Sequence, residues 1–380
     1  MSMSLSGLIT IISSNITAMS AGFRSGRIDN KSRSDYLSMI GRYSFWKNTP
    51  ETAVPECRTY NIVHDFFDAC RIENGAAIYE RGKRRKMLFV GFDGMRADAV
   101  KLVVQDKNSE TTACNAATGT GGISELARQG GVYIAYCGGE TGTETEQTTS
   151  TSACWTSHFT GVWGNKHGII TNDDSKFLAY KTFMLEYAEK GLHTSVAFDW
   201  DPYFDVNLRD EVRYAMRNSL PIRFCDIDRE KKSGDSDAAA FSNFVAPDQP
   251  SASAPYDSGM RDYILSRING GDDIICGIFH NIDTAGHMYG FGSSTQYAGA
   301  VINCDMYAYS LLCAIHEREE KYNEEWLVIF ANDHGGLGRD HGKQTLEERT
   351  TWIASNIPID KKYFSKGYNG FASTDDQEIK

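Results

Sequence analysis

The chain has 380 residues, of which 41% are hydrophobic and 23% are charged, so a collagen-like or wholly disordered protein is excluded. Acidic residues number 50 against 39 Lys and Arg, and the net charge of −11 argues against a protein that coats nucleic acid by neutralising its phosphates. The nine cysteines include no CxxC pair, which excludes a zinc ribbon or a thioredoxin-like motif.

Residues 1–80 carry no chemical motif, and we expect an N-terminal extension that is partly helical or disordered. An apolar patch at residues 5–12 has no basic residue before it, which makes it a poor secretory signal. We therefore expect a cytoplasmic protein in preference to a secreted one. Residues 60–71 suit a short helix packed on the main domain. No run reaches the ~18 apolar residues that a membrane helix needs, so we predict no transmembrane segment.

Residues 81–380 have the pattern of one α/β domain. The basic run 81–86 changes abruptly to the apolar run 87–92, and short apolar runs without alternation are typical of strands buried on both faces of a parallel sheet. Three more such runs are 194–198, 273–279 and 326–331, with helix-like segments between them at 123–129 and 298–312. This alternation predicts a doubly wound, mostly parallel sheet flanked by helices.

Two polar segments interrupt this alternation. Residues 138–152 are rich in Thr, Gly, Glu and Ser, and residues 229–258 are polar with Pro, Ser and Gly. Long loops of this kind in compact domains are often functional lids, although they can also be plain mobile loops. We interpret both as insertions into the domain.

Asp and His residues follow three of the four predicted strands. Asp93 follows the first, Asp283 and His287 follow the third, and Asp333, His334 and His341 follow the fourth. Open α/β sheets bind ligands at the carboxyl ends of their strands, and carboxylate and imidazole are the ligands that zinc and related ions take. Six candidate ligands at one edge of the sheet predict two metal ions.

Each of these residues also has a plain structural interpretation when taken alone. An Asp before Gly, like Asp93, is often a turn former or a helix cap. Asp283 and His287 are four residues apart and share a face if the segment is helical. His334 and His341 could be loop histidines with ordinary hydrogen bonds. Their occurrence together at successive strand ends favours the metal site.

A hydroxyl-rich segment at residues 149–152 leads into a predicted helix at 154–160. A hydroxyl at a helix N-terminus lies where exposed backbone amides and the helix dipole favour an anion. The same pattern is common in ordinary helix N-caps, so it does not decide the function by itself.

Several of these pieces occur in an order that resembles a known family. They are Asp93-Gly-x-Arg-x-Asp98, the hydroxyl segment before Trp155-Thr-Ser-His-Phe-Thr-Gly161, His167-Gly-Ile, Asp283-x-x-Gly-His287, Asp333-His334-Gly and His341-Gly. Together they resemble the type I phosphodiesterase/nucleotide pyrophosphatase branch of the alkaline phosphatase superfamily. The resemblance covers roughly residues 86–355 and implies an alkaline phosphatase-like fold.

The resemblance also implies a metal centre with two divalent ions, Zn²⁺ by preference. The ligands of one ion would be Asp283, His287 and His341, and those of the second would be Asp93, Asp333 and His334. The second ion would also hold the nucleophile, which the family supplies as a threonine. Counting back ten residues from Gly161 gives Thr151 as that nucleophile. Counting forward 21 residues gives Asn172, the position of an asparagine that contacts a phosphoryl oxygen.

The implied function is metal-dependent hydrolysis of phosphodiester or pyrophosphate bonds in a small, nucleotide-like substrate. It would proceed through a phospho-threonine intermediate, and no stable nucleic-acid partner is expected. A phosphonate hydrolase or phosphomonoesterase with the same metals, and a metal-binding protein without turnover, are the alternatives. Ser150 and Ser152 flank Thr151, so a shift of one residue would change the nucleophile. No arginine lies between Thr151 and Arg209, and the neutral Asn172 suits the single charge of a diester.

Overall fold

The computed structural model describes residues 30–174, 178–200, 203, 207–226 and 256–366. The apolar patch at residues 5–12 and most of the predicted insertion at 229–258 lie outside the described residues.

The described strands form one sheet of ten strands. Its main path runs β1 (Val54–Pro55), β5 (Gly131–Tyr136), β10 (Thr350–Ser355), β9 (Glu324–Ala331), β4 (Arg84–Phe92), β8 (Ile274–Phe279), β6 (Thr194–Phe198) and β7 (Ile222–Asp226). A hairpin of β2 (Arg71–Glu73) and β3 (Ala76–Ile78) pairs with the start of β4. The four strands predicted from apolar runs are β4, β6, β8 and β9, and all four are confirmed.

The pairing of these strands confirms the predicted sheet type. β4 is parallel to both β8 and β9, and β6 is parallel to β7 and β8. β10 is antiparallel to its neighbours β5 and β9, and this reversed strand was not predicted. The protein therefore has the predicted α/β fold with a mostly parallel sheet.

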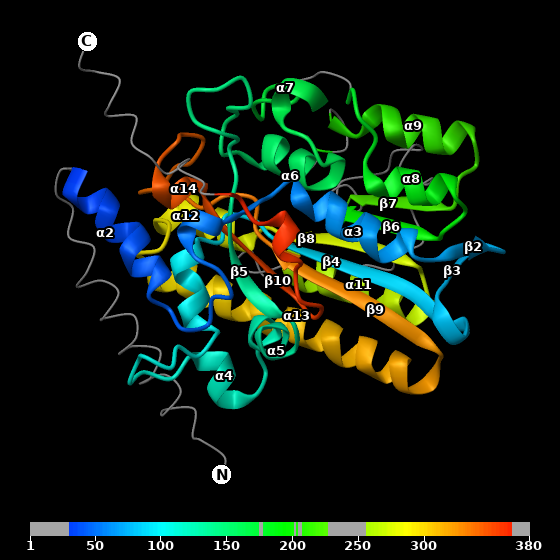
Figure 1. Ribbon diagram of the computed structural model, residues 1–380, viewed down its shortest axis with the longest axis horizontal. Helices are drawn as coiled ribbons and strands as arrows, with labels where there is room; N and C mark the ends of the chain where they lie inside the picture. Colours follow the sequence, from blue (N-terminus) through cyan, green and yellow to red (C-terminus); the bar gives the residue numbers. More distant parts are fainter. Residues whose placement is uncertain (1–29, 175–177, 201–202, 204–206, 227–255, 367–380) are drawn as a thin grey trace.

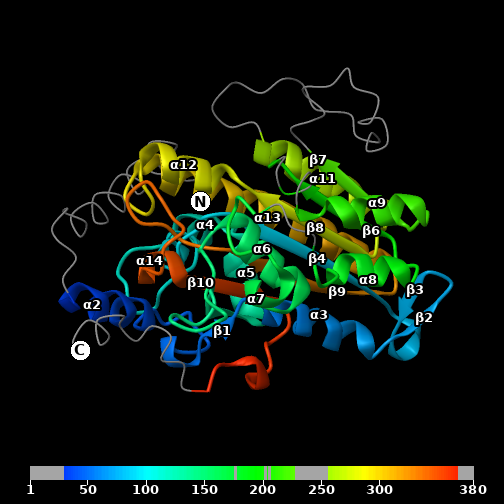
Figure 2. The same cartoon turned by 90° about the horizontal axis from the view of Figure 1, so that it is seen from above.

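Helices cover both faces of the sheet (Figure 1, Figure 2). The α-helices are α2 (Asn30–Gly41), α3 (Arg58–Asp68), α4 (Cys114–Thr118), α5 (Gly122–Gln129), α6 (Thr151–Thr160), α7 (Gly164–His167), α8 (Phe183–Glu189), α9 (Arg209–Arg217), α11 (Tyr256–Gly270), α12 (Asn281–Tyr289), α13 (Thr295–Lys321) and α14 (Leu346–Arg349). Short 3₁₀ turns are η1 (Pro50–Thr52), η2 (Glu80–Gly82), η3 (Ala97–Leu102) and η6 (Lys361–Tyr363).

The central strand β4 shows how the sheet is buried on both sides. Its Leu88 and Val90 side chains pack in one apolar cluster with residues of α5, α11 and α13. Its Met87 and Phe89 side chains pack in a second cluster with residues of α3, α6 and α8. Because successive side chains of a strand point to opposite faces, both faces of β4 need apolar residues, which explains its unbroken apolar run.

Residues before position 81 contribute to this sheet. β1 pairs with β5, β3 pairs with β4, and α3 packs against α6. The helix predicted at 60–71 is α3. The boundary that we expected at residue 80 therefore does not coincide with an edge of the sheet, and the division into an extension and a catalytic domain stays a prediction.

Helix α13 is the one helix in the described part of the chain that is long and apolar enough to cross a membrane. It packs against β9, α5, α11 and α12, and 44% of its most apolar 18-residue window is buried. Core helices pass the same test of length and composition. The absence of a transmembrane segment therefore stays a prediction.

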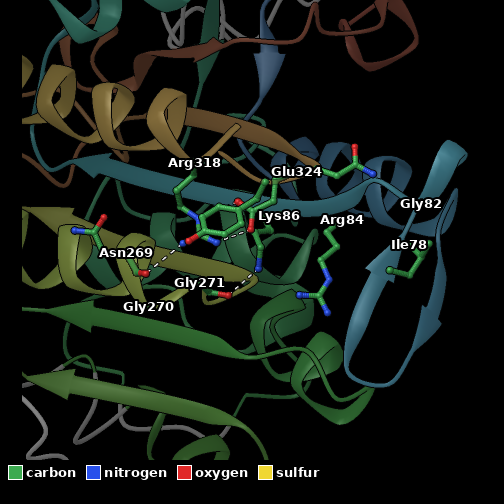
Figure 3. Close-up of a pocket in the computed structure, with 11 residues that line it drawn as sticks. Ile78, Gly82, Arg84, Lys86, Asn269, Gly270, Gly271, Arg318 and Glu324 are labelled. Carbon is green, nitrogen blue, oxygen red and sulfur yellow. Dashed lines mark hydrogen bonds and ion pairs between the residues drawn. The ribbon is translucent and has the colours of Figure 1, made fainter. Parts of the chain in front are cut away.

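A cavity of about 460 Å³ lies at the amino ends of β4, β8 and β9 (Figure 3). Two of its cationic side chains, Lys86 and Arg318, are paired with carboxylates. Lys86 Nζ donates to Asp273 Oδ1 (2.6 Å) and to the Gly271 carbonyl (2.7 Å), and Arg318 Nε donates to Glu324 Oε2 (2.9 Å). These pairs hold the amino ends of the three strands together.

Candidate metal centre

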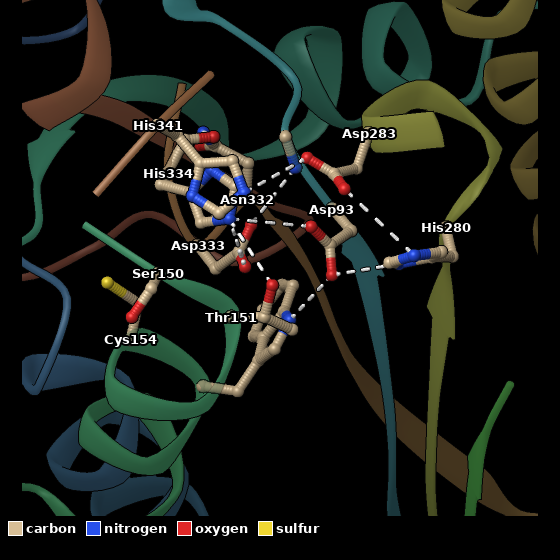
Figure 4. A network of polar contacts seen from close by, with 12 residues as sticks. Asp93, Ser150, Thr151, Cys154, His280, Asp283, Asn332, Asp333, His334 and His341 are labelled. Atoms are coloured by element: carbon tan, nitrogen blue, oxygen red, sulfur yellow. Dashed lines mark hydrogen bonds and ion pairs between the residues drawn. The ribbon is translucent and has the colours of Figure 1, made fainter. Parts of the chain in front are cut away.

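The predicted ligands lie at the carboxyl ends of the same three strands (Figure 4). β4 pairs in parallel with both β8 and β9, so that Phe92 is opposite Phe279 and Gly91 is opposite Ala331. The three strands therefore end at one level of the sheet. The segments that follow them start at Asp93, His280 and Asn332, and they converge on one place.

The first group contains Asp283, His287 and His341, whose donor atoms all lie within 4.8 Å of one another. Asp283 and His287 are four residues apart on α12, so they share one helix face. His287 Nε2 lies 3.3 Å from Asp283 Oδ2 and 3.2 Å from His341 Nε2. The predicted first ligand set is thus brought together by the fold.

The second group contains Asp93, Asp333 and His334, again with all donor atoms within 4.8 Å of one another. All three side chains are buried. His334 Nε2 lies 3.3 Å from Asp333 Oδ2 and 3.6 Å from Asp93 Oδ1. The two groups adjoin, because Asp93 and Asp283 also lie with His280 in a cluster of the same spread.

The three imidazoles of these groups share one orientation. In each of them, Nδ1–H donates to a backbone carbonyl: His287 to Arg339 (2.9 Å), His334 to Gly335 (2.8 Å) and His341 to Thr149 (2.9 Å). This bond fixes the tautomer and leaves the lone pair on Nε2, as it does in metal-ligating histidines. All three Nε2 atoms face the carboxylates.

The carboxylates are held in a corresponding way, by one oxygen each. Asp93 Oδ2 accepts from Trp155 Nε1–H (3.3 Å), and Asp333 Oδ1 accepts from the Gly94 amide (3.1 Å). The other oxygens, Asp93 Oδ1 and Asp333 Oδ2, are buried without a hydrogen-bond partner in the described part of the chain, and so is Asp283 Oδ1. Buried polar atoms without partners are rare in proteins, so these three oxygens require an explanation.

Divalent cations provide that explanation. Unpartnered carboxylate oxygens and imidazole lone pairs converge in two adjacent groups, and both atom types repel one another unless a positive charge lies between them. Carboxylate oxygen and imidazole nitrogen are also the donors that zinc and related divalent ions accept. The two groups of residues therefore have the chemistry to hold divalent metal ions, and the number and identity of the ions stay a prediction.

The pKa values of the cluster reflect the same crowding of charges. Burial, together with the nearby Asp93 carboxylate, raises the pKa of Asp333 well above its usual range. The hydrogen bond to Asp283 raises the pKa of His287 to about 9. Burial and the adjacent His334 lower the pKa of His341 to about 4. Without cations the cluster retains protons, which metal binding would have to displace.

Thr151 begins the helix that faces this cluster. It is the first residue of α6, with Ser150 as the N-cap, so the helix starts three residues earlier than predicted. Thr151 Oγ1 lies 3.4 Å from His334 Nε2. The neighbouring Ser150 hydroxyl is instead hydrogen-bonded to Thr148 Oγ1 (2.5 Å), and Ser152 Oγ has no partner among the described residues. Of the three hydroxyls, that of Thr151 is the one in contact with a candidate ligand.

Asn172 lies beside the same helix N-terminus. Its side-chain Oδ1 accepts from the backbone amide of Ser152 (2.8 Å). This bond uses the acceptor of the amide group and leaves Nδ2, which can only donate. The fold therefore places both Thr151 and Asn172, which are 21 positions apart, at the start of α6.

Three residues that the sequence did not single out hold the cluster in place. His280 Nδ1 lies 3.2 Å from Asp93 Oδ2, and Trp155 donates to the same oxygen. Gly94 has φ of +68°, and a Cβ there would lie 2.8 Å from Asp283 Oδ1. His280 could have been found from its position directly after β8. The roles of Trp155 and Gly94 depend on packing and leave no signal in the spacing.

A family model described as Type I phosphodiesterase / nucleotide pyrophosphatase matches residues 87–341. The chain belongs to this family. The predicted family is therefore confirmed, and the predicted enzyme class, a hydrolase of the phosphodiesterase and pyrophosphatase type, is confirmed at the level of the family. A search of curated proteins finds no match.

Several solved structures are similar to this family member. Phosphonoacetate hydrolase from Sinorhizobium meliloti 1021 is 14% identical over 68% of this chain and 59% of its own, with a TM-score of 0.44. Murine ectonucleotide pyrophosphatase / phosphodiesterase 5 is 18% identical over 66% of this chain and 57% of its own, with a TM-score of 0.41. Alkaline phosphatase from the Antarctic bacterium TAB5 is 11% identical over 75% of this chain and 95% of its own, with a TM-score of 0.46. The chain thus spans less than two thirds of the first two proteins.

Proposed function

We propose that this protein hydrolyses phosphodiester or pyrophosphate bonds in a small, nucleotide-like substrate, with two bound metal ions and Thr151 as the nucleophile. The observation that supports this most strongly is the set of three buried carboxylate oxygens that have no hydrogen-bond partner among the described residues and lie beside the Nε2 atoms of three imidazoles. Such an arrangement needs protons or metal cations to offset its negative charge, and the hydroxyl of a helix N-terminus lies against it.

Zn²⁺ is the ion that we propose for both positions, because the donors are imidazole nitrogen and carboxylate oxygen. One ion would be held by Asp283, His287 and His341, and the other by Asp93, Asp333, His334 and Thr151. When bound, the ions would lower the pKa of the threonine hydroxyl and neutralise charge on the phosphoryl oxygens.

The chain supplies the nucleophile and its orientation. Thr151 Oγ1 would attack the phosphorus and form a phospho-threonine ester while the leaving group departs, and water would then hydrolyse that ester. All ten residues of α6 are buried, which fixes the helix and the direction of the Thr151 side chain. The positive end of the helix dipole at Thr151 favours the anionic phosphoryl group.

Asn172 supports a diester in preference to a monoester. Its Oδ1 is occupied by the Ser152 amide, so its Nδ2–H group remains to donate to a non-bridging phosphoryl oxygen. A neutral donor matches the single negative charge of a diester, whereas a monoester dianion is better matched by a cationic side chain. Phosphonate or phosphomonoester hydrolysis at the same metals, and metal binding without turnover, are therefore outcomes that the experiments must separate.

The first experiment combines elemental analysis with two substrates, bis(p-nitrophenyl) phosphate and p-nitrophenyl phosphate, each with and without chelator. We expect bound zinc and a chelator-sensitive activity that is higher on the diester. A preference for the monoester would keep the metal centre and contradict the role given to Asn172. No turnover after zinc addition would contradict the proposed function.

The second experiment replaces the nucleophile. Thr151→Ala removes the attacking hydroxyl, and we expect diesterase activity to fall to background while the metal content is largely retained. Thr160→Ala is the matched control, because Thr160 is buried at the other end of α6 and its hydroxyl donates to the Thr156 carbonyl. If Thr151→Ala kept full activity, Ser150 or Ser152 would have to be tested in its place.

A further inference from the structure

A second cluster of metal-ligating side chains lies behind helix α6. Glu56, Cys137 and Cys154 have their donor atoms within 4.8 Å of one another, and all three side chains are buried. Cys154 is one helical turn after Thr151, and its sulfur points away from the Asp and His cluster (Figure 4). None of these three residues has a part in the function proposed above.

Strand pairing and helix packing bring the three residues together. Glu56 directly follows β1, and its backbone amide donates to the Tyr136 carbonyl (3.0 Å) at the end of β5. Cys137 directly follows β5, and its amide donates to the Arg349 carbonyl (3.0 Å). The cluster is therefore built on backbone held by the sheet, with α6 supplying Cys154 from the other side.

The carboxylate of Glu56 is the group that needs explanation. Its Oε1 accepts from Gln147 Nε2–H (3.3 Å), whereas Oε2 is buried with no hydrogen-bond partner among the described residues. This oxygen lies 3.9 Å from Nε2 of the buried His158, but burial lowers the pKa of that imidazole to about 3, so it is neutral and does not balance the carboxylate charge. A buried carboxylate without a balancing charge is costly, so it is either neutralised by a proton or bound to a cation. The two thiols nearest to it are the softest ligands that a protein offers.

We propose that Glu56, Cys137 and Cys154 bind a third metal ion, a thiophilic divalent cation for which Zn²⁺ is the natural candidate. Zinc lies about 2.3 Å from sulfur and about 2.0–2.2 Å from carboxylate oxygen, so two ligand atoms of one tetrahedral ion are roughly 3.6–3.8 Å apart. The donor atoms of the cluster lie within 4.8 Å of one another, so side-chain movements of about 1 Å suffice to bind the ion. Three protein ligands leave a fourth position of the tetrahedral site for a water molecule.

The charges of the site are compatible with a divalent ion. Two thiolates and one carboxylate exceed the charge of the ion by one, and the buried Arg349 guanidinium lies beside them, with Nε–H donating to the Cys137 carbonyl (3.4 Å). Burial raises the pKa of Glu56 and of the Cys154 thiol well above their usual ranges, so the groups are protonated without metal. The ion would displace these protons to solvent, and its affinity should rise with pH.

Such an ion would have a structural role that differs from that of the catalytic pair. It would connect the start of α3, the end of β5 and the middle of α6. Since α6 carries Thr151 on its first turn, the ion would fix the helix from the side opposite the substrate. Loading of this site should therefore raise the free energy of unfolding with the logarithm of the free metal concentration once that concentration exceeds the dissociation constant.

The test uses Co²⁺ as the probe on the metal-depleted full chain. Thiolate ligands give cobalt an intense near-ultraviolet charge-transfer absorption, whereas the proposed catalytic centre contains no sulfur ligand. We expect this absorption to appear and to saturate at one equivalent of the thiolate-bound ion per chain. Absence of the band in the wild-type protein would overturn the proposal.

Variants assign the band to the cluster. Cys137→Ala and Cys154→Ala should each abolish it, while Cys276→Ala, which removes a buried thiol outside the cluster, and Cys313→Ala, which removes an exposed one, should retain it. Asp283→Asn should also retain the band, although this substitution damages the proposed catalytic metal pair. The experiment therefore tests the third ion separately from the proposed function. A band that survives Cys137→Ala would overturn the assignment.

A measurement on the unaltered protein covers the case in which these variants do not fold. X-ray absorption at the zinc edge of the zinc-loaded wild-type chain should show sulfur neighbours at about 2.3 Å in addition to nitrogen and oxygen. A zinc spectrum with only nitrogen and oxygen neighbours would overturn the proposal.

Discussion

Buried charged residues lie at both ends of strands β4, β8 and β9, but they are paired with each other at the amino ends and not at the carboxyl ends. At the amino ends, Lys86 is paired with Asp273, and Arg318 with Glu324. At the carboxyl ends, Asp93, Asp283 and Asp333 each keep one buried oxygen that has no hydrogen-bond partner among the described residues. We call the amino ends, where the buried charges are paired, the closed end, and the carboxyl ends, where carboxylate oxygens lack hydrogen bonds among the described residues, the open end.

This comparison teaches what distinguishes a binding site from a structural ion pair. Buried charge is present at both ends, and the amino ends even enclose a cavity (Figure 3). A ligand, however, needs lone pairs that the protein has not already used. The amino-end carboxylates are paired with Lys or Arg, whereas each carboxyl-end carboxylate has one oxygen with no hydrogen bond in the described part of the chain and only imidazoles beside it. Unsatisfied polar atoms, not charge density, mark the site.

The largest effect is expected from Asp283→Asn at the open end. The variant should lose one metal equivalent and on the order of 10³-fold in diesterase activity, since a metal ion supplies several kcal/mol of transition-state stabilisation and each ~1.4 kcal/mol is tenfold. The unfolding free energy of the chelator-treated protein should fall only slightly, because the variant loses the ion pair with the half-exposed His287 but also loses a carboxylate that repels Asp93 and Asp333. Steady-state kinetics, elemental analysis and urea denaturation test these results. A variant that keeps its full metal content and activity would show that the carboxyl ends are not the metal site.

Lys86→Met at the closed end should have the reverse profile. It leaves the Asp273 carboxylate buried without its cation, and breaking a buried pair in this way costs about 3 kcal/mol or more of unfolding free energy. Activity and metal content per folded chain should be unchanged. Urea denaturation together with a diesterase assay at low temperature measures both. Loss of metal in this variant would mean that the two ends are coupled.

A third prediction concerns His167, a buried histidine outside the candidate metal centre. Burial lowers the pKa of His167 to about 3, and both ring nitrogens are hydrogen-bonded, to Ser157 Oγ (3.1 Å) and to the Ile169 amide (3.1 Å). Below its usual pKa of about 6.5, the unfolded chain binds a proton that the folded chain refuses, so this residue makes stability fall as pH decreases from 7 toward 3.

The loss from His167 amounts to about 2 kcal/mol between pH 7 and pH 5. In His167→Gln, the difference between the unfolding free energies at these two pH values should shrink by that amount, whereas replacing the exposed His316 should leave it unchanged. Urea denaturation at both pH values provides the measurement. An identical pH dependence in wild type and His167→Gln would show that this histidine is protonated in the folded protein.

The smallest effect is expected from Trp155→Phe, which removes the Nε1–H donated to Asp93 Oδ2 and keeps an aromatic ring. Loss of a group that orients a metal ligand costs about tenfold in metal affinity or activity. Trp326→Phe is the control at the closed end, where Nε1–H donates to Glu324 Oε2 (3.0 Å). Metal titration of both variants should show weakened binding in the first alone.

The strands that could be predicted from the sequence are those whose burial on both faces requires an uninterrupted apolar run. β4, β8 and β9 are flanked on both faces by helices, so their residues are apolar without interruption and the strands could be located. β10 contains Thr350, Thr351 and Ser355, and its reversed direction follows from its two neighbours. Its apolar run, Trp352–Ala354, is only three residues long, shorter than those of β4, β8 and β9, and β10 was not predicted.

The part of the candidate site that could be predicted consists of residues that come soon after a predicted strand. Asp93, Asp283 and Asp333 are each within a few residues of an apolar run, and their convergence follows from parallel pairing. The contacts of Trp155 and Glu56 were not predictable, because they depend on how a helix and a distant loop pack in three dimensions. The nucleophile remains a prediction, although Thr151 is the hydroxyl in contact with His334.

The position of β4 has a consequence for the order in which the protein folds. β4 is formed by residues 84–92, yet its partners on either side begin at Ile274 and Glu324. Pairing over such separations makes folding slow, and until the chain to residue 331 is available both edges of an apolar strand stay open to other chains. Charged residues that flank an apolar strand oppose such association, and β4 begins with three of them, Arg84, Arg85 and Lys86.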